Sequence, residues 1–257
     1  MRPSRVLQRW QQGRPALCTM VHLLDPAVTE MVSLLGFDCI WLDLEHHPTS
    51  VETASQMMRG ARIGVADVMA RPGKGEFMRM GRLLDAGAQG ILYPRCESVD
   101  EAADVVRWAR FAPRGERGFD GTGPDCPYGF FDPAAYVASA NANTFIAIQV
   151  ESPAAVGAAG EMAAIDGVDM VFFGPADYSI LADHPGEFQH PDVEDAAARA
   201  CRATRRSGKH FGTLCFDDDH VRRMIDLGAT FIAMGSDINL LRAGFADLQS
   251  RMQAMGL

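Results

Sequence analysis

The sequence predicts a single (β/α)8 TIM barrel, an α/β fold, and three observations lead to that fold class. Eight short apolar runs recur along the 257 residues. Most of them are apolar on successive residues instead of alternating, as expected for parallel strands covered on both faces. The joints also repeat: segments such as LLDAGAQGILYP and MIDLGATFIAMG lead from a helix end through a glycine into an apolar run. A doubly wound sheet of this length would more often be shorter or carry a second domain, so we expect one domain over residues 1–257.

The apolar runs define the expected strands, and helical patterns lie between them. The strands are expected at residues 17–21, 39–44, 65–70, 90–93, 145–150, 170–173, 211–215 and 231–234. Gly36, Gly87, Gly167 and Gly228 stand where a left-handed residue can end a helix before the chain enters the next strand. The recurring glycines therefore indicate structural joints, not a ligand-binding motif.

Two segments interrupt the repeat. Residues 113–133 are rich in Gly, Pro and Asp and have no apolar period, which predicts a long loop between the fourth and fifth strands. Residues 238–255 predict an amphipathic C-terminal helix, with Leu241, Phe245 and Leu248 at helical spacing. That helix could cover its own barrel, or it could be exchanged and dock on a neighbouring subunit.

Composition excludes several classes of protein. The chain has 24 Lys and Arg against 33 Asp and Glu, a formal net charge of −9, which argues against a nucleic-acid partner. No uncharged apolar run reaches the roughly 18 residues of a membrane span, and the basic start lacks a signal segment. We therefore expect a cytoplasmic protein with no membrane partner. The six scattered cysteines contain no C-x-x-C pair, which predicts reduced thiols.

Polar residues stand just after the apolar runs, and in a barrel the carboxyl ends of the strands converge on one mouth. These residues are Asp43, Glu45, His46 and His47 after the second strand, then Arg71, Arg95, Glu151 and Asp177 after the next four. Glu151 directly follows FIAIQV, where a buried carboxylate needs a partner. With Asp177 it would form an oxygen ligand pair for Mg²⁺ or a similar hard ion. The alternatives are an ion pair between Glu151 and Arg71, and a helix cap by Asp177.

Two further side chains suit catalysis at this mouth. His46 stands where a general base would be needed, although the adjacent His47 leaves the choice of histidine open on chemistry alone. Arg71 offers a planar, two-pronged donor for a carboxylate or a developing enolate oxygen. Its alternative role is to tie the third strand to a neighbouring acid.

Other common chemistries lack their residues. GKG at 73–75 does not have the spacing of a phosphate-binding loop, and GTGP at 121–124 is not a dinucleotide motif. Lys74 and Lys209 are the only lysines, and neither closes an apolar strand at the mouth. A Schiff-base mechanism therefore has no good candidate residue.

Taken in order, five segments resemble the HpcH/HpaI-type class II (metal-dependent) pyruvate aldolases of the phosphoenolpyruvate/pyruvate barrel superfamily. The segments are GFDCIWLDLEHHP, ARP, LLDAGAQGILYP, IQVES and GVDMVFFGPADYS, and the resemblance covers about residues 26–246. It implies that Glu151 and Asp177 bind a divalent metal (Mg, Mn or Co). It also implies that Gln149, Gly174, Pro175 and Ala176 lie near the bound 2-oxo acid.

The resemblance also assigns the proton-transfer residues. His46, and not His47, follows Asp-x-Glu and precedes x-Pro, and it falls at the catalytic histidine. Arg71 falls at the arginine that contacts the keto oxygen, and Asp85 at the aspartate that pairs with that histidine. The segment GKGEF, the loop after residue 117 and Tyr178 depart from the family pattern. These are expected at the mouth and rim, which suggests a different acceptor aldehyde.

The implied activity is a metal-dependent aldolase that forms or cleaves the bond between the enolate of pyruvate or hydroxypyruvate and an aldehyde, in a homo-oligomer, specifically a hexamer. One alternative is a CoA-ester lyase of the citrate lyase β type, which would need a basic nucleotide-binding surface that the sequence does not show. Others are a decarboxylase or C–C coupling enzyme that uses the same metal enolate, and a barrel with a purely structural metal site.

Overall fold

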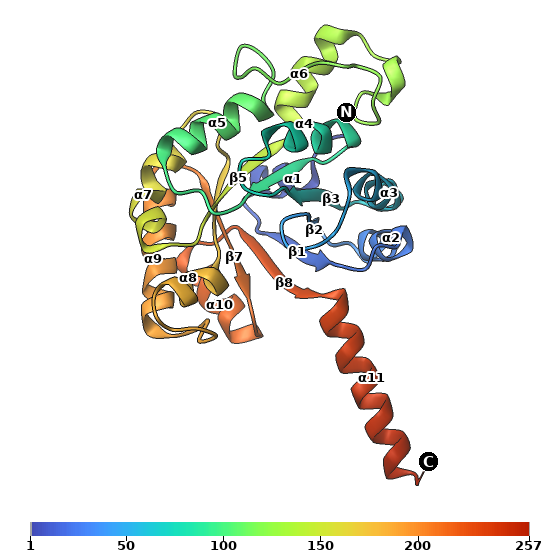
Figure 1. Cartoon of the computed structure of the whole chain (residues 1–257), viewed down its shortest axis with the longest axis vertical. Helices are drawn as coiled ribbons and strands as arrows, with labels where there is room; N and C mark the ends of the chain where they lie inside the picture. The colour runs from blue at the N-terminus through green and yellow to red at the C-terminus, as the bar shows by residue number, and fades with distance from the viewer. Residues whose placement is uncertain (1, 257) are drawn as a thin grey trace.

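The computed structural model describes residues 2–256, and its strands form one closed parallel barrel, β1 to β8 in chain order (Figure 1). The strands are β1 Ala16–Val21, β2 Cys39–Asp43, β3 Asp67–Arg71, β4 Gly90–Tyr93, β5 Phe145–Val150, β6 Met170–Phe173, β7 His210–Cys215 and β8 Phe231–Ser236. The predicted barrel is confirmed, and every strand lies within a few residues of its expected place. The third strand begins at Asp67 and not at residue 65, because Asp67 is the first residue in register with Cys39 of β2.

Helices alternate with the strands, and most of them cover the barrel wall. They are α1 Arg5–Gln11, α2 Pro26–Leu34, α3 Val51–Ala61, α4 Phe77–Ala86, α5 Val99–Ala109, α6 Pro133–Asn143, α7 Pro153–Ala164, α8 Pro175–Leu181, α9 Pro191–Arg206, α10 Asp218–Leu227 and α11 Asp237–Ala254, with a 3₁₀ turn at Pro127–Gly129. Serine side chains cap several starts, as Ser152 does by accepting from the Ala155 N–H. Gly87 and Gly228 end α4 and α10 in the left-handed conformation, with φ of 114° and 110°.

Strand alternation decides which side chains fill the barrel. Trp41, Met69, Phe145 and Phe172 are buried together inside it. Residues two further along β2 and β3 face the same interior, so Asp43 and Arg71 follow Trp41 and Met69 at the carboxyl ends of their strands. The apolar interior thus ends in a polar layer at one mouth.

Helix α1 closes the opposite end of the barrel. The backbone N–H groups of Arg5 and Val6 donate to the buried Asp67 carboxylate at 3.0 and 2.9 Å. Trp10 stacks on His210 with ring centroids 3.9 Å apart and donates to the Thr230 carbonyl at 2.8 Å. Ligands of the polar layer must therefore enter from the carboxyl ends of the strands.

Helix α11 projects away from the barrel (Figure 1), and none of its residues is buried. Its exposed apolar side chains include Leu241, Phe245 and Leu248. An apolar groove of about 380 Å³ lies on the barrel wall, where Leu17 of β1 and Ile232 of β8 face outward. Helix α11 follows β8 in sequence, yet it leaves this groove between β1 and β8 uncovered.

Two expectations from composition can be compared with the structure. All six cysteines are buried, and no disulfide joins them. Within residues 2–256, no helix combines the length and the apolarity that a membrane crossing requires.

Candidate active site

Arg71 is held at the mouth by a two-pronged ion pair. Its Nε and Nη2 atoms donate to the two oxygens of Asp43 at 2.9 and 2.7 Å, and its guanidinium lies over the Trp41 ring, 4.7 Å from the centroid. Burial would raise the pKa of Asp43, but the bonds from Arg71 outweigh it and lower that pKa. Arg71 therefore does tie β3 to a neighbouring acid, as one of the two readings of the sequence expected.

The same guanidinium still faces the centre of the mouth. Its Nη1 lies 3.5 Å from Gln149 Oε1 on β5, and its Nε lies 3.3 Å from Glu45 Oε2. The Glu45 oxygen is buried and has no hydrogen-bond partner, and burial raises the pKa of this carboxyl. One edge of Arg71 is thus fixed by Asp43, and the other can meet a substrate oxygen.

Glu151 is nearly inaccessible, at 2% exposed, directly after β5. The backbone N–H of Arg95 donates to its Oε1 at 2.9 Å, and Arg95 adopts a left-handed backbone with φ of 48°, uncommon outside glycine. On the other side, a Cβ at Gly174 would lie 2.6 Å from Glu151 Oε2 and 2.9 Å from Gln149 Nε2. Gly174 is required there because any side chain would fill the space between these polar groups.

Asp177 brings a second carboxylate to Glu151 from the first turn of α8. Burial and a hydrogen-bond contact with Asp177 raise the pKa of Glu151 to about 8. The adjacent carboxylates of Glu151 and Asp177 form an oxygen-only donor pair, which fits a hard divalent cation. Within the described residues, Arg71 makes no ion pair with Glu151, so the alternative of a simple Glu151–Arg71 pair does not account for the site.

The two histidines of the β2–α3 loop contact different acids. His46 is about half exposed, and its Nε2 lies 3.6 Å from Glu45 Oε2. His47 Nε2 lies 3.9 Å from Asp43 Oδ2, and its ring packs 4.5 Å from that of His22. Both rings are at the mouth, and only His46 neighbours the carboxylate that remains without a hydrogen-bond partner.

Asp85 is not near His46 in the same chain. It lies at the C-terminal end of α4, and α4 runs from the mouth back to the end where the strands begin. There Arg117 Nη2 donates to Asp85 Oδ1 at 2.6 Å and to Asp125 Oδ2 at 2.9 Å. Burial raises the pKa of Asp85. Within one chain, therefore, Asp85 is a partner of Arg117 and not of the histidine.

Three residues of the mouth are not picked out by the sequence alone. Asp237, after β8, accepts from the backbone N–H groups of His22 and Leu23 at 2.8 to 3.1 Å, and Trp41 supports Arg71 from below. The signal for His22 and Asp237 is the same as for Glu151, since each follows an apolar strand. Tyr178 and the long loop are corrections to the expected mouth and rim positions. Tyr178 is 4% exposed and packs on Phe173 at 5.2 Å, so it belongs to the core. Pro124 of the long loop accepts from Arg62, just after α3, so within one chain this loop lies where the strands begin.

A second group of side chains of the metal-ligand type lies around the start of α9. His184 Nε2 is 2.9 Å from Asp192 Oδ2, and the His184 and His190 rings stack at 3.6 Å. His190 Nδ1 already accepts the Asp192 N–H at 3.2 Å. These contacts cap the start of α9, and the group is separate from the carboxylate pair.

The chain is similar to known aldolases along most of its length. The model of the HpcH/HpaI aldolase/citrate lyase family matches residues 19–243. A hydroxypyruvate/pyruvate aldolase of Roseovarius nubinhibens is 36% identical over 217 residues, 84% of each chain. A 5-keto-4-deoxy-D-glucarate aldolase of Salmonella arizonae is 34% identical over 230 residues, 86% of each. The crystal structure of an HpcH/HpaI aldolase from Desulfitobacterium hafniense superposes with a TM-score of 0.90 at 26% identity, covering 96% of each chain.

Proposed function

The chain belongs to the HpcH/HpaI aldolase/citrate lyase family, and from that premise we propose a divalent-metal aldolase whose metal ligands are Glu151 and Asp177. The enzyme is a pyruvate-type aldolase, which joins the enolate of a 2-oxo acid to an aldehyde or cleaves that bond. The metal assignment rests on one observation, the adjacent carboxylates of Glu151 and Asp177 at the mouth of the barrel. The Glu151 carboxylate is almost fully buried there.

Each residue of the mouth has a task in this proposal. A divalent cation bound by Glu151 and Asp177 would supply Lewis acidity that makes the methyl protons of a 2-oxo acid easier to remove. Arg71 donates to the oxygen that gains negative charge, and Gln149, Gly174, Pro175 and Ala176 line the place of the 2-oxo acid. His46 holds or moves the proton of the aldol hydroxyl. The closed N-terminal end keeps the polar layer away from bulk water on that side.

The aldolase reading is favoured over a CoA-ester lyase. The relatives reported above are named aldolases at 34 and 36% identity, although the family also includes citrate lyases. The deciding experiment assays pyruvate and hydroxypyruvate against a panel of aldehydes with Mg²⁺, Mn²⁺ and Co²⁺, beside a CoA ester. Turnover of the CoA ester alone would favour the lyase, and turnover of neither would point to a structural metal site.

Arg71→Lys is expected to reduce aldol turnover more than tenfold. Lysine keeps the positive charge, but it loses the planar fork that bonds Asp43 with one edge and offers the other to the substrate. A tenfold loss corresponds to about 1.4 kcal/mol of transition-state stabilisation. Steady-state kinetics with saturating Mg²⁺ measure the effect, and circular dichroism checks the fold. Turnover close to that of the wild type would leave Arg71 with a structural role only.

Metal affinity is expected to rise with pH up to about pH 8. The carboxyl of Glu151 has a pKa raised to about 8, so below that pH it must lose a proton to bind a cation. The apparent affinity for Mg²⁺ should therefore increase about tenfold per unit between pH 6 and pH 8 and level off above it. Calorimetric titrations at four pH values test this, and an affinity that is constant from pH 6 to pH 8 would contradict the assignment of Glu151.

We also propose that the protein is a homo-oligomer, a hexamer by its family resemblance, in which α11 docks on a second copy. The apolar side chains of α11 match an apolar groove that the barrel leaves open. The double variant Phe245→Glu and Leu248→Glu should lower the mass measured by analytical ultracentrifugation. Gln249→Glu, on the same exposed helix, is the matched control and should keep the wild-type mass. An unchanged mass in the double variant would exclude α11 from the interface.

A further inference from the structure

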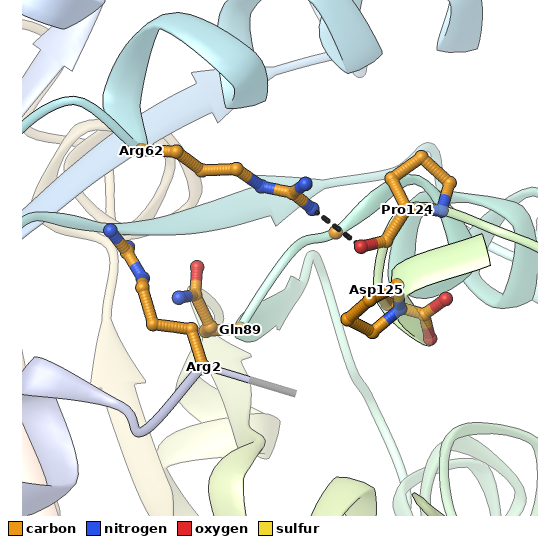
Figure 2. Close-up of a pocket in the computed structure, with 7 residues that line it drawn as sticks. Arg2, Arg62, Gln89, Pro124 and Asp125 are labelled. Carbon is orange, nitrogen blue, oxygen red and sulfur yellow. Dashed lines mark hydrogen bonds between the residues drawn. The ribbon is translucent and has the colours of Figure 1, made fainter. Parts of the chain in front are cut away.

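A cavity opens at the N-terminal end of the barrel, away from the carboxylates of the mouth. Its volume is about 160 Å³, and Arg2, Arg62 and Gln89 line it together with residues 124–127 of the long loop (Figure 2). Arg62 follows the last residue of α3, and Gln89 directly precedes β4. The cavity therefore lies where the strands begin and shares no lining residue with the proposed aldolase site.

Arg62 reaches across this cavity with most of its hydrogen-bonding capacity unused. Its Nη2 donates to the Pro124 carbonyl at 3.1 Å, as the dashed line in Figure 2 shows. No ion pair within the described part of the chain includes Arg62, and a guanidinium carries five N–H donors. A Cβ at Gly87 would lie 2.4 Å from Nη2, and Gly87 has φ of 114°. Only glycine thus allows the guanidinium to lie against this turn.

Gln89 and Arg2 add further donors. Gln89 is 5% exposed, and its Oε1 accepts the Val68 N–H at 3.2 Å, which fixes the amide orientation and leaves the NH₂ group to donate. Arg2 also lines the cavity; it donates to the Gly64 carbonyl at 3.3 Å and to the Ala66 carbonyl, and its Nη2 lies 3.8 Å from Asp67 Oδ1.

The acidic side chain in the lining does not neutralise these donors. The Asp125 carboxylate is turned away from Arg62 (Figure 2) and accepts from Arg117 Nη2 at 2.9 Å and from the Tyr136 hydroxyl. Burial lowers the pKa of Arg62 and of Arg2; for Arg2 the Asp67 carboxylate opposes this effect and the like charge of Arg62 adds to it. In a chain with a formal charge of −9, Arg62 thus presents a guanidinium to the cavity without an ion-pair partner among the described residues.

We propose that this cavity binds a small oxyanion, either inorganic phosphate or an organic carboxylate, through Arg62, Arg2 and Gln89. A planar guanidinium and an amide NH₂ are suited to pairs of anionic oxygens. The volume of about 160 Å³ admits a tetrahedral oxyanion or a short carboxylic acid. The anion would connect the end of α3, the turn before β4 and the long loop.

Calorimetric titration of the Mg²⁺-loaded, full-length protein tests the proposal, with inorganic phosphate and succinate as separate probes. One anion should bind per chain, and Arg62→Gln should weaken the tighter probe at least tenfold. Arg59→Gln, one turn earlier on α3 and outside the cavity lining, is the matched control and should change the affinity less than twofold. The tighter of the two probes identifies the kind of oxyanion. Arg2→Gln provides a second variant if Arg62→Gln alters the thermal melt.

Three results would overturn the proposal. In the first, Arg62→Gln and Arg2→Gln bind the probe as the wild type does, which would place the anion elsewhere, for example at Arg71. In the second, Arg59→Gln weakens binding as much as Arg62→Gln, which would indicate a general charge effect. In the third, neither probe binds the wild type at concentrations on the order of 10 mM. Because anion binding is measured directly and no variant changes a residue of the mouth, the outcome does not depend on aldolase turnover.

Discussion

Glu151→Ala is expected to lower metal-stimulated aldol cleavage at least a thousandfold, a loss of about 4 kcal/mol in transition-state stabilisation. Glu151 supplies a nearly inaccessible carboxylate that only Asp177 and the Arg95 N–H approach. Removing it takes away one of two proposed protein ligands, and the remaining Asp177 cannot hold a divalent ion as firmly. Asp177→Ala should have a comparable effect. Metal affinity from calorimetry and turnover from a coupled assay should fall together.

Glu151→Gln separates metal binding from folding. The folded carboxyl has a pKa of about 8 against an ordinary value of 4.5, so the metal-free wild type loses stability progressively as pH rises from about 4.5 to about 8. At pH 9 the metal-free Gln variant should therefore melt at a higher temperature than the wild type, yet Mg²⁺ should not raise it further. Glu161→Gln, exposed on α7, should match the wild type in both measurements. If Glu151→Ala and Asp177→Ala each bound Mg²⁺ with the affinity of the wild type, the assignment of these two carboxylates as metal ligands would be wrong.

His46→Ala is expected to lower aldol cleavage by two to four orders of magnitude, the usual contribution of a positioned general acid or base. His47→Ala should retain most of the activity, because His47 contacts Asp43 and His22 and not the unpartnered Glu45 oxygen. Asp85→Asn should also reduce cleavage if Asp85 orients His46. The opposite result, an active His46→Ala and an inactive His47→Ala, would assign the general base to His47.

The position of Asp85 allows a sharper version of this experiment. Since Asp85 and His46 lie at opposite ends of one chain, the proposed pairing requires Asp85 of one copy beside His46 of another. Unfolding and refolding His46→Ala together with Asp85→Asn should then restore activity, because about one site in four combines both intact residues in random assemblies. If Asp85 acts only through Arg117 in its own chain, every mixture will stay as inactive as its components.

Most of the barrel could be predicted because its sequence pattern is local. The apolar runs and the glycines at helix ends depend on a few neighbouring residues each, and the structure places β2 and β4 to β6 where the runs stand. The rule that polar residues after strands meet at one mouth correctly brought together Arg71, Glu151 and Asp177. It needed no knowledge of distances, because parallel strands fix which end each residue occupies.

The parts that escaped prediction depend on long-range contacts. Whether Arg71 would pair with Asp43 or remain free is set by the register of β2 against β3, which aligns these two residues. The pairing of Asp85 with Arg117 joins α4 to the long loop, 32 residues away, and no local pattern reveals it. Tyr178 follows the metal-ligand candidate in sequence but points into the core, since neighbouring helix positions face different directions.

The free apolar face of α11 also affects how the stability of this protein should be measured. In the proposed oligomer, α11, which has no buried residue in its own chain, would become buried only on association, so folding and assembly would be linked by mass action. The melting temperature should then rise with protein concentration, and an unfolding free energy determined at one dilution cannot be applied at another.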